Sequence, residues 1–257
     1  MNRRDYLLAG ATLGTAGLAG CSFLAAAEAP PPDVPKQRLE DGGWTRTDQS
    51  SETVFDRSYG PVTVEAVSST VQYADEQLQE RVASRTLDQV QTALSVFFAT
   101  RVDFSPNLDN LPAGVGREEL LAEVRTNARD SFEQQMEAQG LTDIEKSGEG
   151  TIGIDTGETA ETVELSAVYP FEGISFDVTD DEAVEIPASD IDISAMFAVW
   201  HHGDFVVISG GAYPAQNFEQ VVENDLSDGI TVTVDVDLGL QPDTYRTEVR
   251  NLVTGVE

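Results

Sequence analysis

The stretch SAMFAVWHHGDFVVISGGAY, residues 194–213, decides the fold. Its two halves are runs of mostly apolar residues, and Gly203-Asp204 separates them. A two-residue connection of this kind joins antiparallel strands in a tight hairpin. Because each run is apolar at consecutive positions, both faces of each strand are expected to be buried. The stretch therefore predicts a hairpin of two central strands in an antiparallel sheet.

Further strands are expected before and after this hairpin, where apolar residues alternate with polar ones or form short apolar runs. Thr156-Gly157-Glu158 is a turn signal between two of these segments and predicts a second hairpin. The segments are 61–67, 93–104, 151–155, 161–169 and 230–238.

Residues 117–139 give the clearest helical pattern. Their apolar residues recur at spacings of three and four, which places them on one stripe of a helix. Gly140 follows as a glycine after a helix end does. The stripe consists of Leu121, Val124, Ala128, Phe132 and Met136.

Three other helices are expected, over 75–90, 218–226 and 242–254, the last with Pro242 in its first turn. Helices that alternate with hairpin-linked strands predict an α+β domain, an antiparallel sheet with helices packed on one face. We assign residues 37–257 to this single domain.

The order of these elements resembles that of small lipoprotein domains with the PsbP/Mog1-like fold. The chain also resembles haloarchaeal twin-arginine-exported lipoproteins to which no reaction is assigned. In that group a His-Gly-Asp turn precedes a Phe-Val-Val strand and a Tyr-Pro ending, here His202 to Val207 and Tyr213-Pro214. The resemblance covers about residues 95–214 and implies fold and location, with no mechanism.

The first 21 residues have the pattern of an export signal. Arg3 and Arg4 precede an uncharged run, 7–20, that is too short to span a bilayer, which needs about 20 apolar residues. The paired arginines resemble the twin-arginine type of signal. Leu18-Ala19-Gly20-Cys21 resembles a lipobox, in which Cys21 receives the lipid.

These residues predict a signal peptide over 1–20 and attachment to membrane lipid through Cys21. The location expected is the extracytoplasmic face of the cell membrane, and the alternative is an uncut signal anchor. The Pro- and Ala-rich residues 21–36 are expected to form an extended tether between anchor and domain.

The chain carries 46 acidic and 15 basic residues, a net charge of −31. This excess argues against a nucleic acid partner, because phosphate binding needs Lys and Arg. Lys36 and Lys146 are the only lysines. Such a surface is typical of a protein that works in concentrated salt, where repulsion between carboxylates is screened. The alternative is a calcium-binding or merely acidic protein of a low-salt organism.

Candidate metal ligands are few. His201 and His202 are adjacent, so on a strand they point to opposite faces and do not grip one ion together. The acidic segment 177–185 is a weak candidate for calcium, through Asp177, Asp180, Asp181 and Glu182, but it lacks the EF-hand pattern of glycine and glutamate. A solvated loop is the simpler interpretation.

Two pairs of carboxylates, Asp190 with Asp192 and Asp235 with Asp237, are expected on polar strand faces. They are the groups through which acid–base chemistry would run. The sequence contains no nucleophile elbow, P-loop or dinucleotide-binding motif, and its only cysteine is Cys21. We therefore expect no cofactor and no enzyme.

Three functions remain open on these grounds. The first, which we favour, is a non-enzymatic, protein-binding accessory module of an envelope complex. The second is a lipoprotein that binds a small solute or lipid in a pocket between sheet and helix. The third is a carboxylate-dependent hydrolase.

Overall fold

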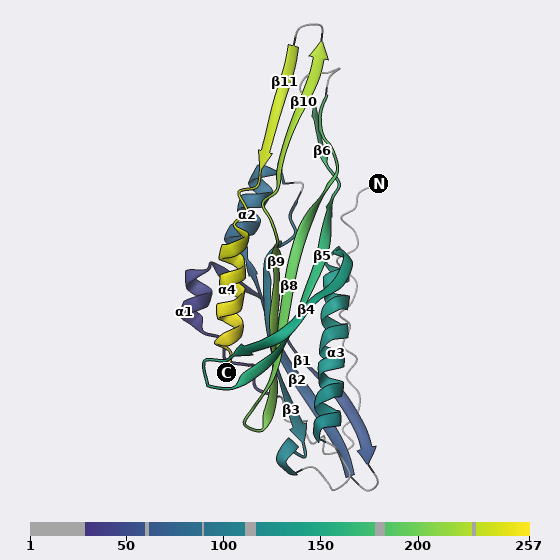
Figure 1. Cartoon of the computed structure of the whole chain (residues 1–257), viewed down its shortest axis with the longest axis vertical. Coiled ribbons are helices and arrows are strands. Elements are labelled where there is room, and N and C mark those ends of the chain that lie inside the picture. The colour runs from purple at the N-terminus through teal and green to yellow at the C-terminus, as the bar shows by residue number, and fades with distance from the viewer. Residues whose placement is uncertain (1–28, 60–61, 89, 111–116, 178–182, 228–229) are drawn as a thin grey trace, which may run out of the picture.

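The hairpin of residues 194–213 lies at the centre of a large antiparallel sheet (Figure 1). The computed structural model describes residues 29–59, 62–88, 90–110, 117–177, 183–227 and 230–257. Seven of the described strands form the main sheet, in the order β1-β2-β3-β9-β8-β5-β4. Their bounds are β1 Trp44–Tyr59, β2 Val62–Asp75, β3 Val96–Ser105, β4 Thr142–Gly153, β5 Thr159–Phe171, β8 Ser189–His202 and β9 Phe205–Pro214.

Strands β8 and β9 confirm the predicted hairpin. His202 pairs with Phe205 across the turn, and the pairing continues to Ile193 and Pro214. Gly203 has a φ of +57°, a backbone conformation that glycine adopts without steric cost. Because β3 and β5 flank the two strands, both are central, as their apolar faces predicted.

The four α-helices of the described residues lie on both faces of the sheet (Figure 1), and a short 3-10 helix, Leu108–Asn110, follows β3. Helix α3 lies alone on one face. Helices α1, α2 and α4 lie on the other, the face of Phe97 and Gly211. The helix bounds are α1 Lys36–Asp41, α2 Glu76–Arg85, α3 Arg117–Ala138 and α4 Pro242–Thr254.

The strand register separates the two faces. Phe98, Gly210 and Phe197 lie side by side, and Phe132 of α3 packs on the rings of Phe98 and Phe197 at 5.1 and 5.8 Å. The next residue along β9, Gly211, faces α4. The prediction that helices pack on one face is therefore corrected. Central strands that are apolar on both sides need a cover on each side.

Gly211 lets α4 approach the sheet closely. A Cβ atom at this position would lie 3.0 Å from a methyl carbon of Val249 and 2.4 Å from the carbonyl oxygen of Val96. Helix α4 begins at Pro242 and buries Tyr245, Val249, Leu252 and Val253, as the sequence predicted.

The predicted helix over 218–226 is wrong. These residues belong to β10, Glu219–Ser227, which pairs with β11, Ile230–Asp237. A second small hairpin joins β6, Ile174–Asp177, to β7, Ala183–Ile186, and β7 lies against β10. The two hairpins form an arm that extends beyond one end of the main sheet (Figure 1).

The folded part of the chain begins earlier than residue 37. Ala29, Pro32 and Val34 are buried, and the backbones of Asp33 and Glu257 exchange two hydrogen bonds of 2.8 and 2.9 Å. The last eight residues assigned to the tether, 29–36, therefore pack on the domain. In the described part of the chain, no helix has the length and apolar character that crossing a membrane requires.

Candidate functional site

A groove runs between α3 and the sheet because the helix packs tightly at only part of its length. Phe132 and Met136 are 4% and 2% exposed, whereas Leu121, Val124 and Ala128 of the same stripe are partly buried. Val124 and Ala128 line the groove from above, and β1, β2 and β3 form its floor and outer wall. Its volume is about 560 Å³.

The floor of the groove combines apolar surface with hydroxyl groups. Phe98, Val102 and Ile208 supply the apolar part. Thr70 and Thr100 lie beside them, and their hydroxyls hydrogen-bond to each other at 2.9 Å. Such a lining suits a ligand that has an apolar body and a few hydrogen-bonding groups.

The charged groups at the groove are acidic. Glu52, Glu123 and Asp130 line it, and none of the described residues that line it is Lys or Arg. Arg57 of β1 reaches across to Glu123 at 2.9 Å and ties α3 to the edge strand. The remaining carboxylates disfavour an anionic ligand.

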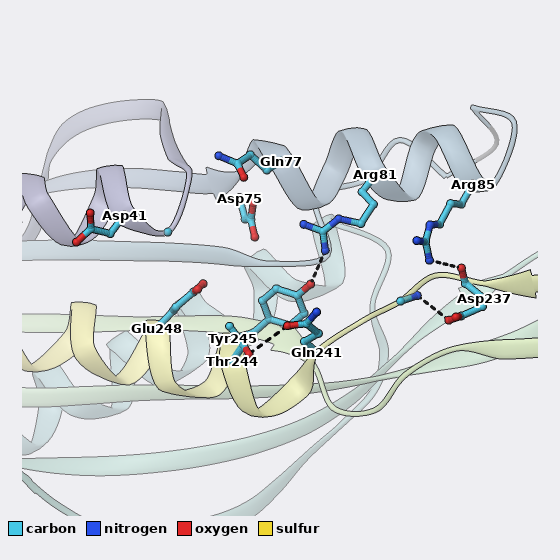
Figure 2. A pocket seen from close by; sticks show the side chains of 12 residues that line it. Asp41, Asp75, Gln77, Arg81, Arg85, Asp237, Gln241, Thr244, Tyr245 and Glu248 are labelled. Carbon is cyan, nitrogen blue, oxygen red and sulfur yellow. Dashed lines mark hydrogen bonds between the residues drawn. The ribbon is translucent and has the colours of Figure 1, made fainter.

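A second cavity, of polar character, lies on the opposite side of the sheet between α2 and α4 (Figure 2). Its volume is about 420 Å³. Acidic, basic and amide side chains from these two helices, the end of α1 and the end of β11 surround it. Its charged members are Asp41, Asp75, Arg81, Arg85, Asp237 and Glu248.

Two carboxyl groups in this pocket have raised pKa values. Burial raises the pKa of Asp75, whose side chain also accepts a 2.8 Å hydrogen bond from the backbone N–H of Leu78 and so caps α2. Burial, and then the charge of Asp75, raises the pKa of Glu248. The positive charge of Arg81 partly offsets the rise at Asp75.

The two arginines in the pocket contact neutral oxygen atoms. Arg81 donates to the hydroxyl of Tyr245 at 3.2 Å, and Arg85 donates to the backbone carbonyl of Asp237 at 2.5 Å. The Asp237 side chain accepts from Asn217 and from the backbone of Gly239, and these bonds lower its pKa. The pocket therefore holds groups of both charges around one space.

The structure places the two histidines as predicted, on opposite faces. The His201 ring lies 3.0 Å from a guanidinium nitrogen of Arg117 on α3. On the other face, His202 Nδ1 lies 2.7 Å from Glu158 Oε1. A hydrogen bond from Thr156, and then the one with His202, lowers the pKa of Glu158.

The predicted carboxylate pairs are exposed and lie apart from both cavities, except that Asp237 lines the polar pocket. Asp192 accepts a hydrogen bond from Gln216. Asp177 ends β6, while Asp180, Asp181 and Glu182 lie outside the described residues. Over the described ranges, no group of three or more His, Cys, Asp or Glu could hold a metal ion.

The residues proposed for export and anchoring also lie outside the described part of the chain. They are Arg3, Arg4, Leu18, Ala19, Gly20 and Cys21.

Sequence reasoning missed the polar pocket. The sequence feature that could have indicated this pocket is the pair Arg81 and Arg85, which lie one helical turn apart in a chain with only 15 basic residues.

The comparisons with known proteins place the chain in a family. No curated protein and no solved structure matches it. Residues 31–257 match the model of a family described as "Domain of unknown function (DUF6517)". Since the match spans most of the 257 residues, the chain belongs to the DUF6517 family.

Proposed function

We propose that this protein is a lipid-anchored lipoprotein of the extracytoplasmic membrane face, and that its domain binds a ligand without catalysing a reaction. The anchor is Cys21, after export through the Arg3-Arg4 signal. The acidic surface keeps the protein dispersed in concentrated salt. The observation that carries the binding function is the groove between α3 and the sheet.

The groove fits a small amphipathic solute or lipid. Its volume of about 560 Å³ lies within the range of small-molecule sites, roughly 300–1,000 Å³. Phe98, Val102 and Ile208 would pack on the apolar body of the ligand, and the Thr70 and Thr100 hydroxyls would orient its polar group. The carboxylates of Glu52 and Asp130 favour a ligand that is neutral or cationic.

The groove can be tested with a blocked variant and a matched control on the same helix. Ala128 lines the groove, whereas Ala122 is exposed on α3 away from it. The full-length protein, its Ala128→Phe variant and its Ala122→Phe variant would be purified in mild detergent at high salt and analysed by native mass spectrometry.

We expect a bound molecule of defined mass with the parent and with Ala122→Phe, and its loss with Ala128→Phe. In a direct assay, octanol and octylamine should bind the parent and octanoate should not. Equal retention by the two phenylalanine variants would overturn the assignment of the groove. No retained molecule and no binding of any octyl probe would overturn ligand binding itself.

A protein partner is the second candidate, and the arm of β6, β7, β10 and β11 favours it. Val221 on β10 is 65% exposed, and Glu219 and Glu223 flank it on the same strand face. Val221 would supply an apolar contact, and the flanking carboxylates would supply part of the polar rim, of an interface with another protein. In-cell crosslinking, followed by purification at high salt, should recover one envelope protein in near-equal amount. Recovery of the chain alone would count against this candidate.

A further inference from the structure

We propose that the polar pocket between α2 and α4 is a second binding site, for a small zwitterion. Its anionic group would face Arg81 and Arg85, and its ammonium group would face Asp75 and Glu248. This site is independent of the groove beneath α3, which lies on the other face of the sheet.

The first observation is that the arginines of the pocket are not used in ion pairs. Among the described residues, no carboxylate lies within 4.0 Å of the guanidinium nitrogens of Arg81 or Arg85. Each guanidinium has five N–H donors, and each makes one hydrogen bond, to a neutral oxygen. In a chain with 46 acidic residues, two such arginines facing one cavity indicate a site for an external anion.

The second observation is the pair of carboxyl groups that line the same cavity. Asp75 is 4% exposed, and one of its oxygens is occupied by the Leu78 N–H. Glu248 reaches into the cavity from α4 (Figure 2). Burial raises the pKa of both carboxyls, and the charge of Asp75 adds to the rise at Glu248, whereas the charge of Arg81 partly offsets the rise at Asp75. An ammonium group between the two carboxyls would offset their charge and satisfy the remaining oxygens.

The third observation is the size of the polar pocket and the chemistry of the residues that line it. About 420 Å³ holds a molecule of amino-acid to dipeptide size. Gln77, Gln241 and Thr244 add neutral hydrogen-bonding groups to the lining. A metal ion fits less well, because no group of three ligands able to hold one occurs over the described ranges. A ligand with a single charge would leave either the two arginines or the two carboxyls of the pocket without an oppositely charged partner.

Calorimetric titration of the full-length protein with matched probes tests the proposal. L-Glutamine and glycyl-L-glutamine are zwitterions, N-acetyl-L-glutamine carries only the anionic group, and L-glutaminamide carries only the cationic group. We expect at least one zwitterion to bind at least tenfold more tightly than both of the singly charged probes.

Two variants separate the carboxyls of the pocket from its arginines. Glu248→Gln should weaken binding of the zwitterion and of L-glutaminamide at least tenfold and leave binding of N-acetyl-L-glutamine unchanged. Arg85→Gln should weaken binding of the zwitterion and of N-acetyl-L-glutamine at least tenfold and leave binding of L-glutaminamide unchanged. Glu80→Gln and Arg250→Gln are the matched controls, since both side chains are exposed and neither lines the pocket. Thermal unfolding of each variant shows whether it is folded.

Absence of saturable binding of both zwitterions would overturn the proposal, as would equal affinity for all the probes. A charged probe that binds as tightly as the zwitterions would overturn it too. The groove variant Ala128→Phe should bind the zwitterion like the parent. Failure of this site is thereby distinguished from failure of the groove.

Discussion

Phe132 is the side chain that fixes α3 to its face of the sheet, so its truncation tests the two-sided arrangement. The ring is 4% exposed and contacts Phe98 and Phe197 at 5.1 and 5.8 Å between centroids, the second edge-on. Truncation of a buried Phe to Ala costs about 3–5 kcal/mol. The loss of unfolding free energy for Phe132→Ala should lie in the upper part of this range, because the substitution removes two aromatic contacts, each worth about 0.5–1.5 kcal/mol.

The measurement is the free energy of unfolding from urea titration in concentrated KCl, followed by circular dichroism. Each kcal/mol lowers the melting temperature of a domain of this size by about 2–4 °C, so we expect a decrease of roughly 6–20 °C. Val221→Ala is the control, since that side chain is 65% exposed and its truncation should cost no more than about 0.5 kcal/mol. A loss below about 1 kcal/mol for Phe132→Ala would refute the docking of α3 described here.

Four further predictions follow from other features. Cys21→Ser should move the protein from the membrane fraction to the soluble or unprocessed fraction on a fractionation blot, and an unchanged, fully processed membrane-bound product would contradict lipid attachment. Because the net charge is −31, the melting temperature should rise with KCl from about 0.1 M, where the screening length is about 10 Å, to about 1 M, where it is about 3 Å. A maximum in dilute buffer would contradict the halophilic interpretation. The folded state raises the pKa of Glu248 above its ordinary 4.5 and so binds more protons, which means that stability falls as pH rises above about 4.5; Glu248→Gln should flatten this fall in urea titrations at several pH values. Gly211→Ala should cost about 1–3 kcal/mol in the same assay, because its Cβ would press on Val249 and the Val96 carbonyl.

Local pattern was enough to predict the centre of the sheet. The two apolar runs around Gly203-Asp204 specified β8 and β9 because a tight turn fixes the register and the doubly apolar pattern fixes a central position. The bounds of α4 were also predictable, since Pro242 marks its start and the inward residues recur at helical spacing. These elements carry their own signals within a few residues.

Strand β10 of the arm was mispredicted as a helix because its sequence pattern fits both structures, whereas the predicted strand over 230–238 is confirmed as β11. Phe218, Val221 and Val222 have the spacing of one helix face, yet the strand pairs with β11 from Glu219 to Ser227. The pairing with a strand further along the chain overrides the helical spacing, and a window over 218–226 does not contain that partner.

Local sequence pattern also could not predict which face of the sheet each helix covers. Helix α3 has an apolar stripe in either arrangement, and only the register of Phe98 and Phe197 shows which face it covers. The groove follows from this placement. Val124 and Ala128 belong to the predicted stripe, but how far they are buried depends on how closely the helix approaches the sheet.

The candidate sites divide in the same way. The opposed directions of His201 and His202 follow from strand geometry and were predictable. The polar pocket joins Asp75 and Arg81 to Glu248, which lies more than 160 residues further along the chain. No motif spans that separation, so only the packing of α2 beside α4 reveals it.

The hydrogen bonds between Asp33 and Glu257 join the first described residues to the last ones, and under the lipid anchoring proposed above they would receive any load from Cys21. Cys21 lies eight residues before Ala29, the first described residue. At 3.3–3.6 Å per residue, this segment spans at most about 29 Å. Such a load would enter the fold at the buried residues Ala29 and Val34, and the Asp33 hydrogen bonds would pass it to Glu257, three residues beyond α4. The load would then act on the pairing of Asp33 with Glu257 before it reached the edge strand β1.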